Sequence, residues 1–259
     1  MSHARRHTRP QQRVGFSVLE ILVALVVVAI LLAITIPTLR SVRDASRRTD
    51  SSSNLRTHAQ ILTVYTLDHA GTLPGWRTPS EFEADSIEPP FPQSRYFRIH
   101  TYWHLIPGGD YYEGGMENET LWPDGFRRSP ESTFPYQTPY LLPCTFAADP
   151  GFWDEETRRY GDGQWGAQRL SRVAYPSKKA LVVESWPHRE RVRQARDRFS
   201  VGLPVALADG STQRPSARER YSGYPKGDGA SHQALGAVHP SSTGLLLHTR
   251  EGVLGRDIR

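Results

Sequence analysis

An apolar stretch near the N-terminus is the clearest pattern in the chain. Between Phe16 and Ile36 the only polar side chains are two hydroxyls and the carboxylate of Glu20, and the run from Ile21 to Ile34 has none. As a helix the stretch is about 30 Å long, which is the thickness of the hydrocarbon core of a bilayer. The pattern therefore predicts a transmembrane helix over residues 16–37.

A second helical pattern follows this stretch. Pro37 either ends the membrane helix or kinks it, since a proline inside a helix removes one backbone hydrogen bond. Farther on, apolar residues recur at helical spacing from Leu55 to Thr66 and stop near Gly71, and we interpret this stripe as core packing rather than a binding face. Residues 38–71 are therefore predicted to continue one long helix, with an interruption allowed at residues 47–53.

The remaining residues, 72–259, are predicted to form one globular domain. Residues 74–166 are rich in proline, glycine and aromatic residues. This composition favours short elements and loops that are held together by aromatic packing. We expect residues 74–166 to be a loop-rich insertion within the domain.

Strand patterns come after the insertion. The apolar runs Ala180–Trp186 and Val201–Ala208 each predict a strand, and the second ends at Asp209-Gly210, a strong turn signal. A last strand is expected from Gly244 to His248.

The positive charge of the chain is concentrated at its start. The net charge is +5, and four of these charges come from arginines that precede the apolar stretch, with no acid among them: Arg5, Arg6, Arg9 and Arg13. The positive-inside rule then predicts a cytoplasmic N-terminus and a translocated remainder. The rest of the chain is nearly neutral, so no nucleic-acid surface is expected.

A cleaved secretory signal peptide is the alternative explanation of a basic start followed by an apolar run. Such a peptide ends in small residues at a cleavage site of the A-x-A type. Residues Ala33 to Pro37 read AITIP, which is a poor site. An uncleaved signal anchor explains the apolar run and the arginines, but it explains neither Gly15-Phe16 nor Glu20.

The segment Gly15-Phe16-Ser17-Val18-Leu19-Glu20, which follows a basic leader and opens an apolar helix, resembles the signal of type IV prepilins and type II secretion pseudopilins. The resemblance covers residues from Gly15 to about Pro37. It implies that a prepilin peptidase removes residues 1–15 by cutting after Gly15, and that Phe16 becomes the N-methylated first residue. It also implies a pilin-like α+β fold, in which the long helix packs on a small antiparallel sheet.

Glu20 also has a physical interpretation of its own. A carboxylate in a membrane-length apolar segment costs roughly 2.5 to 3.5 kcal/mol on insertion scales, so a partner is expected. Residues 16 and 20 share one helix face, and a cut after Gly15 would create an ammonium group on Phe16. In a filament, Glu20 of one subunit could pair with the ammonium of its neighbour and set the register between helices.

The resemblance further implies where the chain acts and with what. The expected location is a single pass through the inner membrane, with the N-terminus cytoplasmic and the C-terminal domain outside, followed by assembly into a pilus or a periplasmic pseudopilus. The expected partners are prepilin peptidase, other pilin or pseudopilin subunits, an inner-membrane assembly platform and membrane lipid. No cofactor and no catalysis are expected.

A second, less specific resemblance involves the end of the helix. The segment from Asn54 to Pro74 resembles pilin-like proteins of some environmental bacteria, in which a histidine precedes an apolar strand that ends in Asp-Gly. Here Phe199 stands ten residues before Asp209, and His239 leads to Glu251-Gly252 at a longer spacing. The chain therefore departs from the pattern of that subgroup.

Potential metal ligands lack a compact motif. The histidines and acids that could be combined are His232, His239, His248, Asp149, Asp154, Glu155 and Glu156. None follows a zinc or EF-hand spacing, so no metal is expected. The resemblance to pseudopilins, some of which carry calcium in their C-terminal loops, implies that Asp209 or Asp228 could bind calcium, but a role in surface turns is the simpler interpretation.

Signals for other functions are sparse. The chain has no G-x-S-x-G motif, and its single cysteine, Cys144, excludes an internal disulfide and lies in an apolar stretch, where a buried inert thiol is expected. The basic run at residues 189–198 is interleaved with acids. It gives the only support for the alternative function, a minor pilin that binds DNA or a surface ligand at a filament tip.

Overall fold

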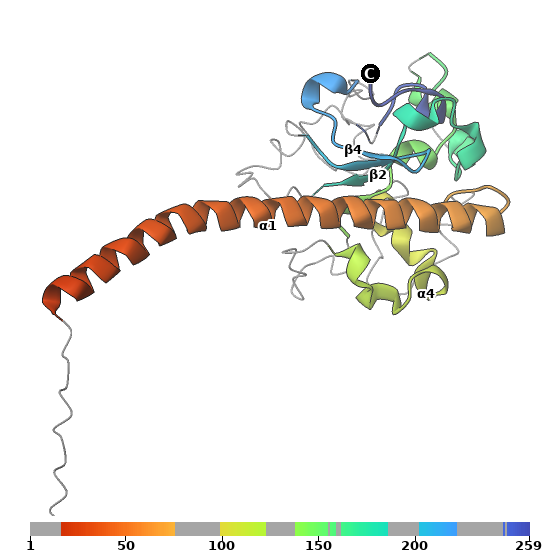
Figure 1. Cartoon of the computed structure of the whole chain (residues 1–259). Coiled ribbons are helices and arrows are strands. Elements are labelled where there is room, and N and C mark those ends of the chain that lie inside the picture. Colours follow the sequence, from red (N-terminus) through yellow and green to blue (C-terminus); the bar gives the residue numbers. More distant parts are fainter. Residues whose placement is uncertain are drawn as a thin grey trace, which may run out of the picture. The chain divides into compact units, whose positions relative to one another are not determined.

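The computed structural model describes residues 17–75, 99–122, 138–154, 156–158, 162–185, 202–221, 246 and 248–259. The chain divides into two compact units, Met1–Ala45 and Ser46–Arg259. A long helix and a small antiparallel sheet give the predicted α+β composition (Figure 1).

Helix α1 (Val18–Asp68) is continuous, including residues 47–53, where an interruption had been allowed. Ser51 explains the difference, because its hydroxyl donates a hydrogen bond to the buried carboxylate of Glu184 on strand β2. A tertiary contact thus stabilises a segment whose helix propensity is weak. The helix ends at Asp68, slightly before the predicted end, and Ala70 and Gly71 turn the chain with φ angles of +53° and +82°.

The second half of α1 buries one stripe of side chains in the globular unit. Leu55, Ala59 and Leu62 are at most 1% exposed. They pack in one apolar cluster with Val182 and Ala206 of the sheet. The stripe predicted as core packing is therefore confirmed.

The sheet has four antiparallel strands in the order β1-β2-β3-β4. Their bounds are Tyr140–Leu141, Ala180–Glu184, Val205–Leu207 and Thr212–Gln213. The predicted strands at residues 180–186 and 201–208 correspond to β2 and β3, and both are shorter than predicted. The turn at Asp209-Gly210 joins β3 to β4, a strand too short to leave a sequence pattern.

Strand β2 is buried along its whole length, because both faces of the sheet are covered. Leu181 and Val182 belong to the cluster that includes α1, whereas Ala180 and Val183 belong to a second cluster with Leu246 and other residues. The strand register shifts between Ala180 and Val182. This irregularity allows the consecutive residues Leu181 and Val182 to pack in the same apolar cluster.

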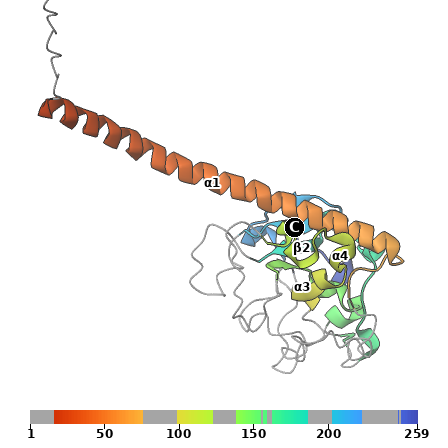
Figure 2. The same ribbon diagram turned by 90° about the horizontal axis from the view of Figure 1, so that it is seen from below.

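The predicted insertion contains more regular structure than loops alone. Its described part includes β1 and the short helices α3 (Ile99–Tyr102) and α4 (Gly108–Tyr111), which Figures 1 and 2 show near the C-terminal end of α1. The backbone N–H of Leu142 donates to the carbonyl of His100, and the indole of Trp103 donates to the carbonyl of Tyr140. These two bonds attach the helical part of the insertion to β1, which is the edge strand of the sheet.

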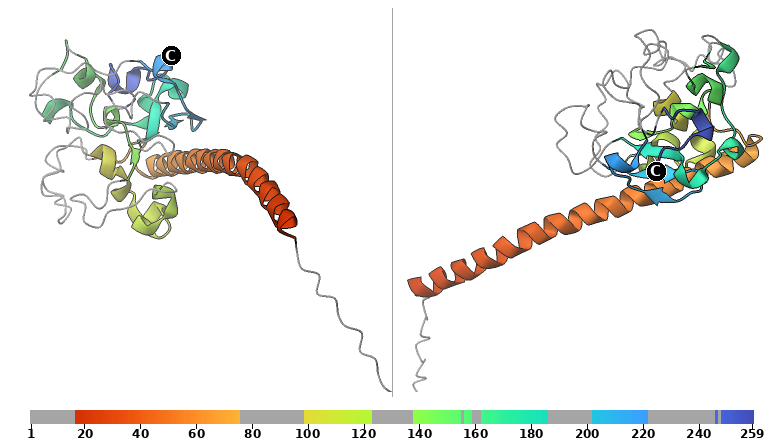
Figure 3. Two further views of the ribbon diagram at one scale, coloured as in Figure 1. Left: turned by 90° about the vertical axis from the view of Figure 1, so that its left-hand side faces the viewer. Right: turned by 90° about the horizontal axis from the view of Figure 1, so that it is seen from above.

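Single turns of 3-10 helix connect most of the other elements (Figure 3). Their bounds are Trp103–Leu105, Gly115–Glu117, Glu119–Leu121, Cys144–Phe146, Pro150–Trp153, Asp162–Gln164, Leu170–Arg172, Pro176–Lys178, Ala217–Glu219 and Gly252–Leu254.

The expected last strand, Gly244 to His248, is wrong for the two positions that the structure describes. Leu246 lies in a turn with a φ of +66°, and His248 lies in a bend. Leu246 is nevertheless buried in the second apolar cluster. The apolar run therefore supplies core contacts from a turn, and residues 244, 245 and 247 are outside the described residues.

Candidate functional site

The first half of α1 is an apolar surface that the rest of the described chain leaves open. Its large apolar side chains from Val18 to Val42 are 46% to 81% exposed. Glu20 is the only charged residue between Val18 and Leu39. The helix is long and apolar enough to cross a membrane, and none of its most apolar window is buried as it would be in a core helix.

Glu20 takes part in a capping box with Ser17 at the start of α1. The backbone N–H of Ser17 donates to Glu20 Oε2 at 2.8 Å, and the backbone N–H of Glu20 donates to Ser17 Oγ at 3.2 Å. Each side chain thus satisfies a backbone donor that the first turn of a helix leaves without an intrahelical partner. The spacing Ser-x-x-Glu was visible in the sequence and had not been interpreted as a cap.

The capping box at Ser17 and Glu20 marks the start of α1 and uses only one oxygen of the Glu20 carboxylate. Helix α1 begins at Val18. Gly15 and Phe16, at the predicted cleavage position, lie outside the described residues. The remaining carboxylate oxygen, Oε1, accepts no hydrogen bond from a described residue.

Pro37 lies inside α1 and does not end it. A proline at this position cannot donate to the carbonyl four residues earlier. Two threonines near it bond to other carbonyls of the same turns, Thr35 to Leu31 at 2.7 Å and Thr38 to Ile34 at 2.9 Å. The interpretation of Pro37 as the end of the helix is therefore wrong.

The described part of the chain brings together no group of three or more histidines, cysteines or acids that could hold a metal ion. The ring of His248 stacks on that of Trp153, Asp149 forms an exposed ion pair with Arg172, and the Asp154 and Asp209 side chains accept backbone N–H groups in turns. Glu156 is exposed, and the other candidates, His232, His239, Asp228 and Glu155, lie outside the described residues.

Cys144 is fully buried, as predicted. Burial raises the pKa of its thiol to about 12, because the thiolate would lose its hydration. The thiol is therefore poorly suited to nucleophilic chemistry.

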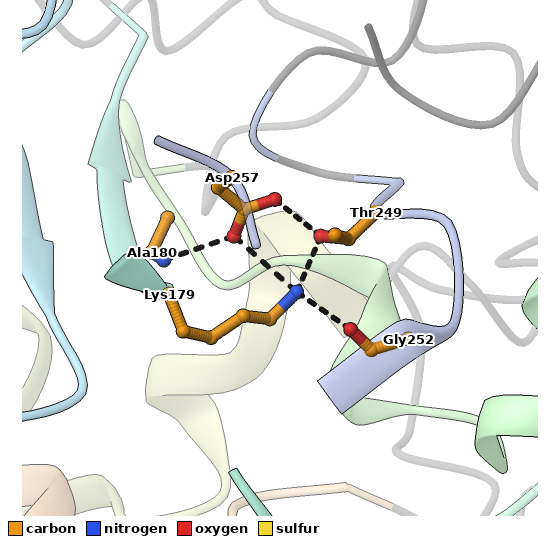
Figure 4. A network of polar contacts seen from close by, with 5 residues as sticks. All are labelled: Lys179, Ala180, Thr249, Gly252 and Asp257. Carbon is orange, nitrogen blue, oxygen red and sulfur yellow. Dashed lines mark hydrogen bonds and ion pairs between the residues drawn. The ribbon is translucent and has the colours of Figure 1, made fainter. Parts of the chain in front are cut away.

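A buried ion pair attaches the C-terminal segment to the start of β2 (Figure 4). Lys179 Nζ lies 3.3 Å from Asp257 Oδ2 and donates to the carbonyl of Gly252 at 2.9 Å and to the hydroxyl of Thr249. Asp257 also accepts the backbone N–H of Ala180 at 2.9 Å and the hydroxyl of Thr249. The three donors of the ammonium group all have partners within the chain.

This arrangement is structural rather than catalytic. Lys179 is 0% exposed and Asp257 is 2% exposed, so a substrate cannot reach either group. Desolvation lowers the pKa of Lys179, and the nearby carboxylate of Asp257 opposes that shift. Sequence reasoning missed the pair, because Asp257 and the start of β2 are 77 residues apart and share no local pattern.

His58 connects α1 to the insertion in the main core. Its Nε2–H donates to the carbonyl of Thr120 at 3.0 Å, so Nδ1 accepts the hydroxyl of Tyr112 at 2.9 Å. The rings of Trp103 and Tyr140 pack against the imidazole, with centroid distances of 5.7 and 4.5 Å. Desolvation lowers the pKa of His58 to about 3, so the imidazole is neutral near pH 7.

No family model, curated protein or solved structure matches the chain. The geometry and the sequence signal therefore carry the functional argument.

Proposed function

We propose that the chain is a structural subunit of a type IV pilus or a type II secretion pseudopilus. In this proposal, prepilin peptidase hydrolyses the bond between Gly15 and Phe16, Phe16 is N-methylated, and the subunit assembles through α1. The observation that carries the proposal is the apolar part of α1 from Val18 to Leu39, which is exposed along its length and has Glu20 as its only charged residue.

An exposed apolar helix of this length requires an apolar environment. Bilayer lipid supplies one before assembly, and the corresponding helices of other subunits would supply one afterwards. The partners of this proposal are therefore membrane lipid, pilin or pseudopilin subunits, the peptidase and an inner-membrane assembly platform. The subunit itself performs no catalysis.

The geometry of Glu20 supports a role in pairing between subunits. Hydrolysis after Gly15 leaves a carboxylate on Gly15 and an ammonium group on Phe16. The capping bond from Ser17 uses only Oε2 of Glu20, and Oε1 accepts no bond from a described residue. A neighbouring subunit's ammonium could pair there in an environment of low dielectric constant, where an unpaired charge is costly.

The first experiment tests processing. The full chain in membranes is incubated with a prepilin peptidase and a methyl donor, and the N-terminus is identified by mass spectrometry. Loss of residues 1–15 and a methylated Phe16 are expected, whereas Gly15→Ala should block the cut. A wild-type chain that retains Met1 or Ser2 would refute the proposal.

The second experiment separates the two roles of Glu20. Glu20→Gln keeps an oxygen that can accept the Ser17 N–H but removes the charge, so it should insert and be processed normally and yet assemble poorly. Ser17→Ala removes the cap to Glu20 N–H and keeps the carboxylate, so it should assemble. Normal filament yield from Glu20→Gln, measured by shearing and immunoblotting, would rule out the pairing role.

A further inference from the structure

A cluster of arginines follows the apolar segment directly. Its members are Arg40, Arg43, Arg47 and Arg48, and the only acid between them is Asp44. Asp44 and Arg47 are half-buried and interact with other groups. The remaining three arginines are exposed.

Arg40 and Arg43 are available to an external ligand. Both are exposed, and neither side chain forms an ion pair or hydrogen bond with a described residue. They lie three residues apart in α1, so they occupy neighbouring positions on one side of the helix. Two guanidinium groups placed in this way can bind phosphate oxygens with paired N–H donors.

Their distance along the helix from the apolar segment matches the layers of a bilayer. The helix from Val18 to Leu39 is about 33 Å long, close to the ~30 Å of a hydrocarbon core. The polar layer on each side adds about 5 to 7 Å. Arg40 follows Leu39 immediately and Arg43 is about 4.5 Å farther along the axis, so a helix that spans the core holds both within the headgroup layer.

Both arginines belong to the first compact unit, Met1–Ala45. The first buried residue of α1, Ser51, comes later in the sequence and belongs to the second unit, Ser46–Arg259. Arg40 and Arg43 therefore belong to the stretch that the apolar segment places at the membrane surface.

We propose that Arg40 and Arg43 form a binding site for the phosphate of an anionic phospholipid, at the membrane face opposite the N-terminus. This site rests on the membrane-spanning helix of the proposed function, but not on processing or assembly. It would hold the subunit in the bilayer until lipid contacts are exchanged for contacts between subunits. Extraction would then require the loss of two arginine–phosphate contacts.

The test uses the full, unprocessed chain in non-ionic detergent micelles. Dioleoyl-phosphatidylglycerol or dioleoyl-phosphatidylcholine is titrated in, and bound lipids are counted by native mass spectrometry. The wild type should prefer the anionic lipid. The double variant Arg40→Gln, Arg43→Gln should bind it about 30-fold more weakly, since an arginine near an anionic surface contributes about 1 kcal/mol.

Two controls make the result specific. Arg56→Gln removes an exposed arginine of the same helix that belongs to the second compact unit, and it should keep the wild-type affinity. The double variant Arg40→Lys, Arg43→Lys keeps the charge without the planar fork, so it should retain most of the preference for the anionic lipid.

Three results would overturn the proposal: unchanged binding by the double glutamine variant, an equal loss in Arg56→Gln, or equal affinity of the wild type for both lipids. Circular dichroism of each variant shows whether α1 is intact. Because the peptidase is absent from this experiment, its outcome is separate from that of the processing test.

Discussion

The imidazole of His58 shows how much one buried polar residue can determine. It is the only titratable group in the buried stripe of α1 from Leu55 to Leu62. Both ring nitrogens are bonded, and the proton on Nε2 is required by the carbonyl of Thr120. Because burial lowers its pKa to about 3, His58 stays neutral in the folded chain over a range in which it would be charged when unfolded.

This shift makes the stability of the chain depend on pH. An unfolded histidine has a pKa of 6.5 and the folded one a pKa of about 3, so below pH 6.5 protons bind preferentially to the unfolded state. Unfolding free energy should therefore fall by about 2 kcal/mol between about pH 8 and about pH 5. Urea denaturation of the full chain in micelles, followed at each pH, measures the loss.

Two variants test whether His58 causes the loss. His58→Gln can still donate to Thr120 and accept from Tyr112, but it cannot titrate, so its loss of stability over this pH range should be about 2 kcal/mol smaller than that of the wild type. His69→Gln, at an exposed position directly after the same helix, should keep the wild-type slope. An unaltered slope in His58→Gln would assign the pH dependence to other groups.

At the scale of elements, the sequence predicted the helices, strands and turns whose signals lie within a few neighbouring residues. The strand at residues 180–184 and the turn at Asp209-Gly210 followed from an apolar run and a turn dipeptide. The local sequence did not predict the continuity of α1 through Ser51, because that continuity depends on a bond to Glu184, 133 residues away. Strand β1 likewise has two residues, and only its pairing with β2 defines it.

The residues described for the candidate site also fall into two groups, those that the local sequence predicts and those that it does not. The apolar segment and Glu20 were evident from the sequence, because hydropathy and charge can be read one residue at a time. The Lys179–Asp257 pair was not, since a lysine and an aspartate carry no information about a partner that folding brings close from far along the chain. Burial of both groups is a property of the assembled core alone.

Replacement of Lys179 tests how the C-terminal segment is held on the sheet. Lys179→Met would leave the Asp257 carboxylate buried with only the Ala180 N–H and the Thr249 hydroxyl as partners. A loss of about 3 to 5 kcal/mol in unfolding free energy is expected, as when one partner of a buried pair is removed. Thermal or urea unfolding of the full chain in micelles gives the value.

The neighbouring residue provides a matched control. Lys178 is half-buried and donates to the carbonyl of Arg259 at 2.6 Å, outside the buried network. Lys178→Met should cost less than about 1 kcal/mol. Similar losses in the two variants would show that the buried pair contributes nothing beyond an ordinary surface contact.

At the scale of the whole molecule, arginines flank the apolar segment on both sides. Four precede it, at positions 5, 6, 9 and 13, and four follow it, at positions 40, 43, 47 and 48. The positive-inside rule counts arginines and lysines in such short flanks and gives little weight to acids. The two flanks therefore oppose each other in equal number, and the arginine count alone does not fix the proposed orientation with a cytoplasmic N-terminus.

This balance predicts that the orientation is easy to disturb. Replacement of the four leading arginines by glutamine should give a mixed population, because the second cluster would then favour the opposite orientation. Alkaline phosphatase fused after Arg259 reports orientation, since it is active only outside the cytoplasm, and the activity should fall severalfold relative to the unaltered chain.

The matched control removes both clusters. If the arginines at positions 40, 43, 47 and 48 are also replaced by glutamine, neither flank is favoured by charge, and phosphatase activity should recover part of the way. Full activity in the first variant would mean that the globular unit, rather than the arginines, sets the orientation. The same second cluster would then act only through the lipid phosphates that Arg40 and Arg43 are proposed to bind, and its removal would change lipid affinity without changing topology.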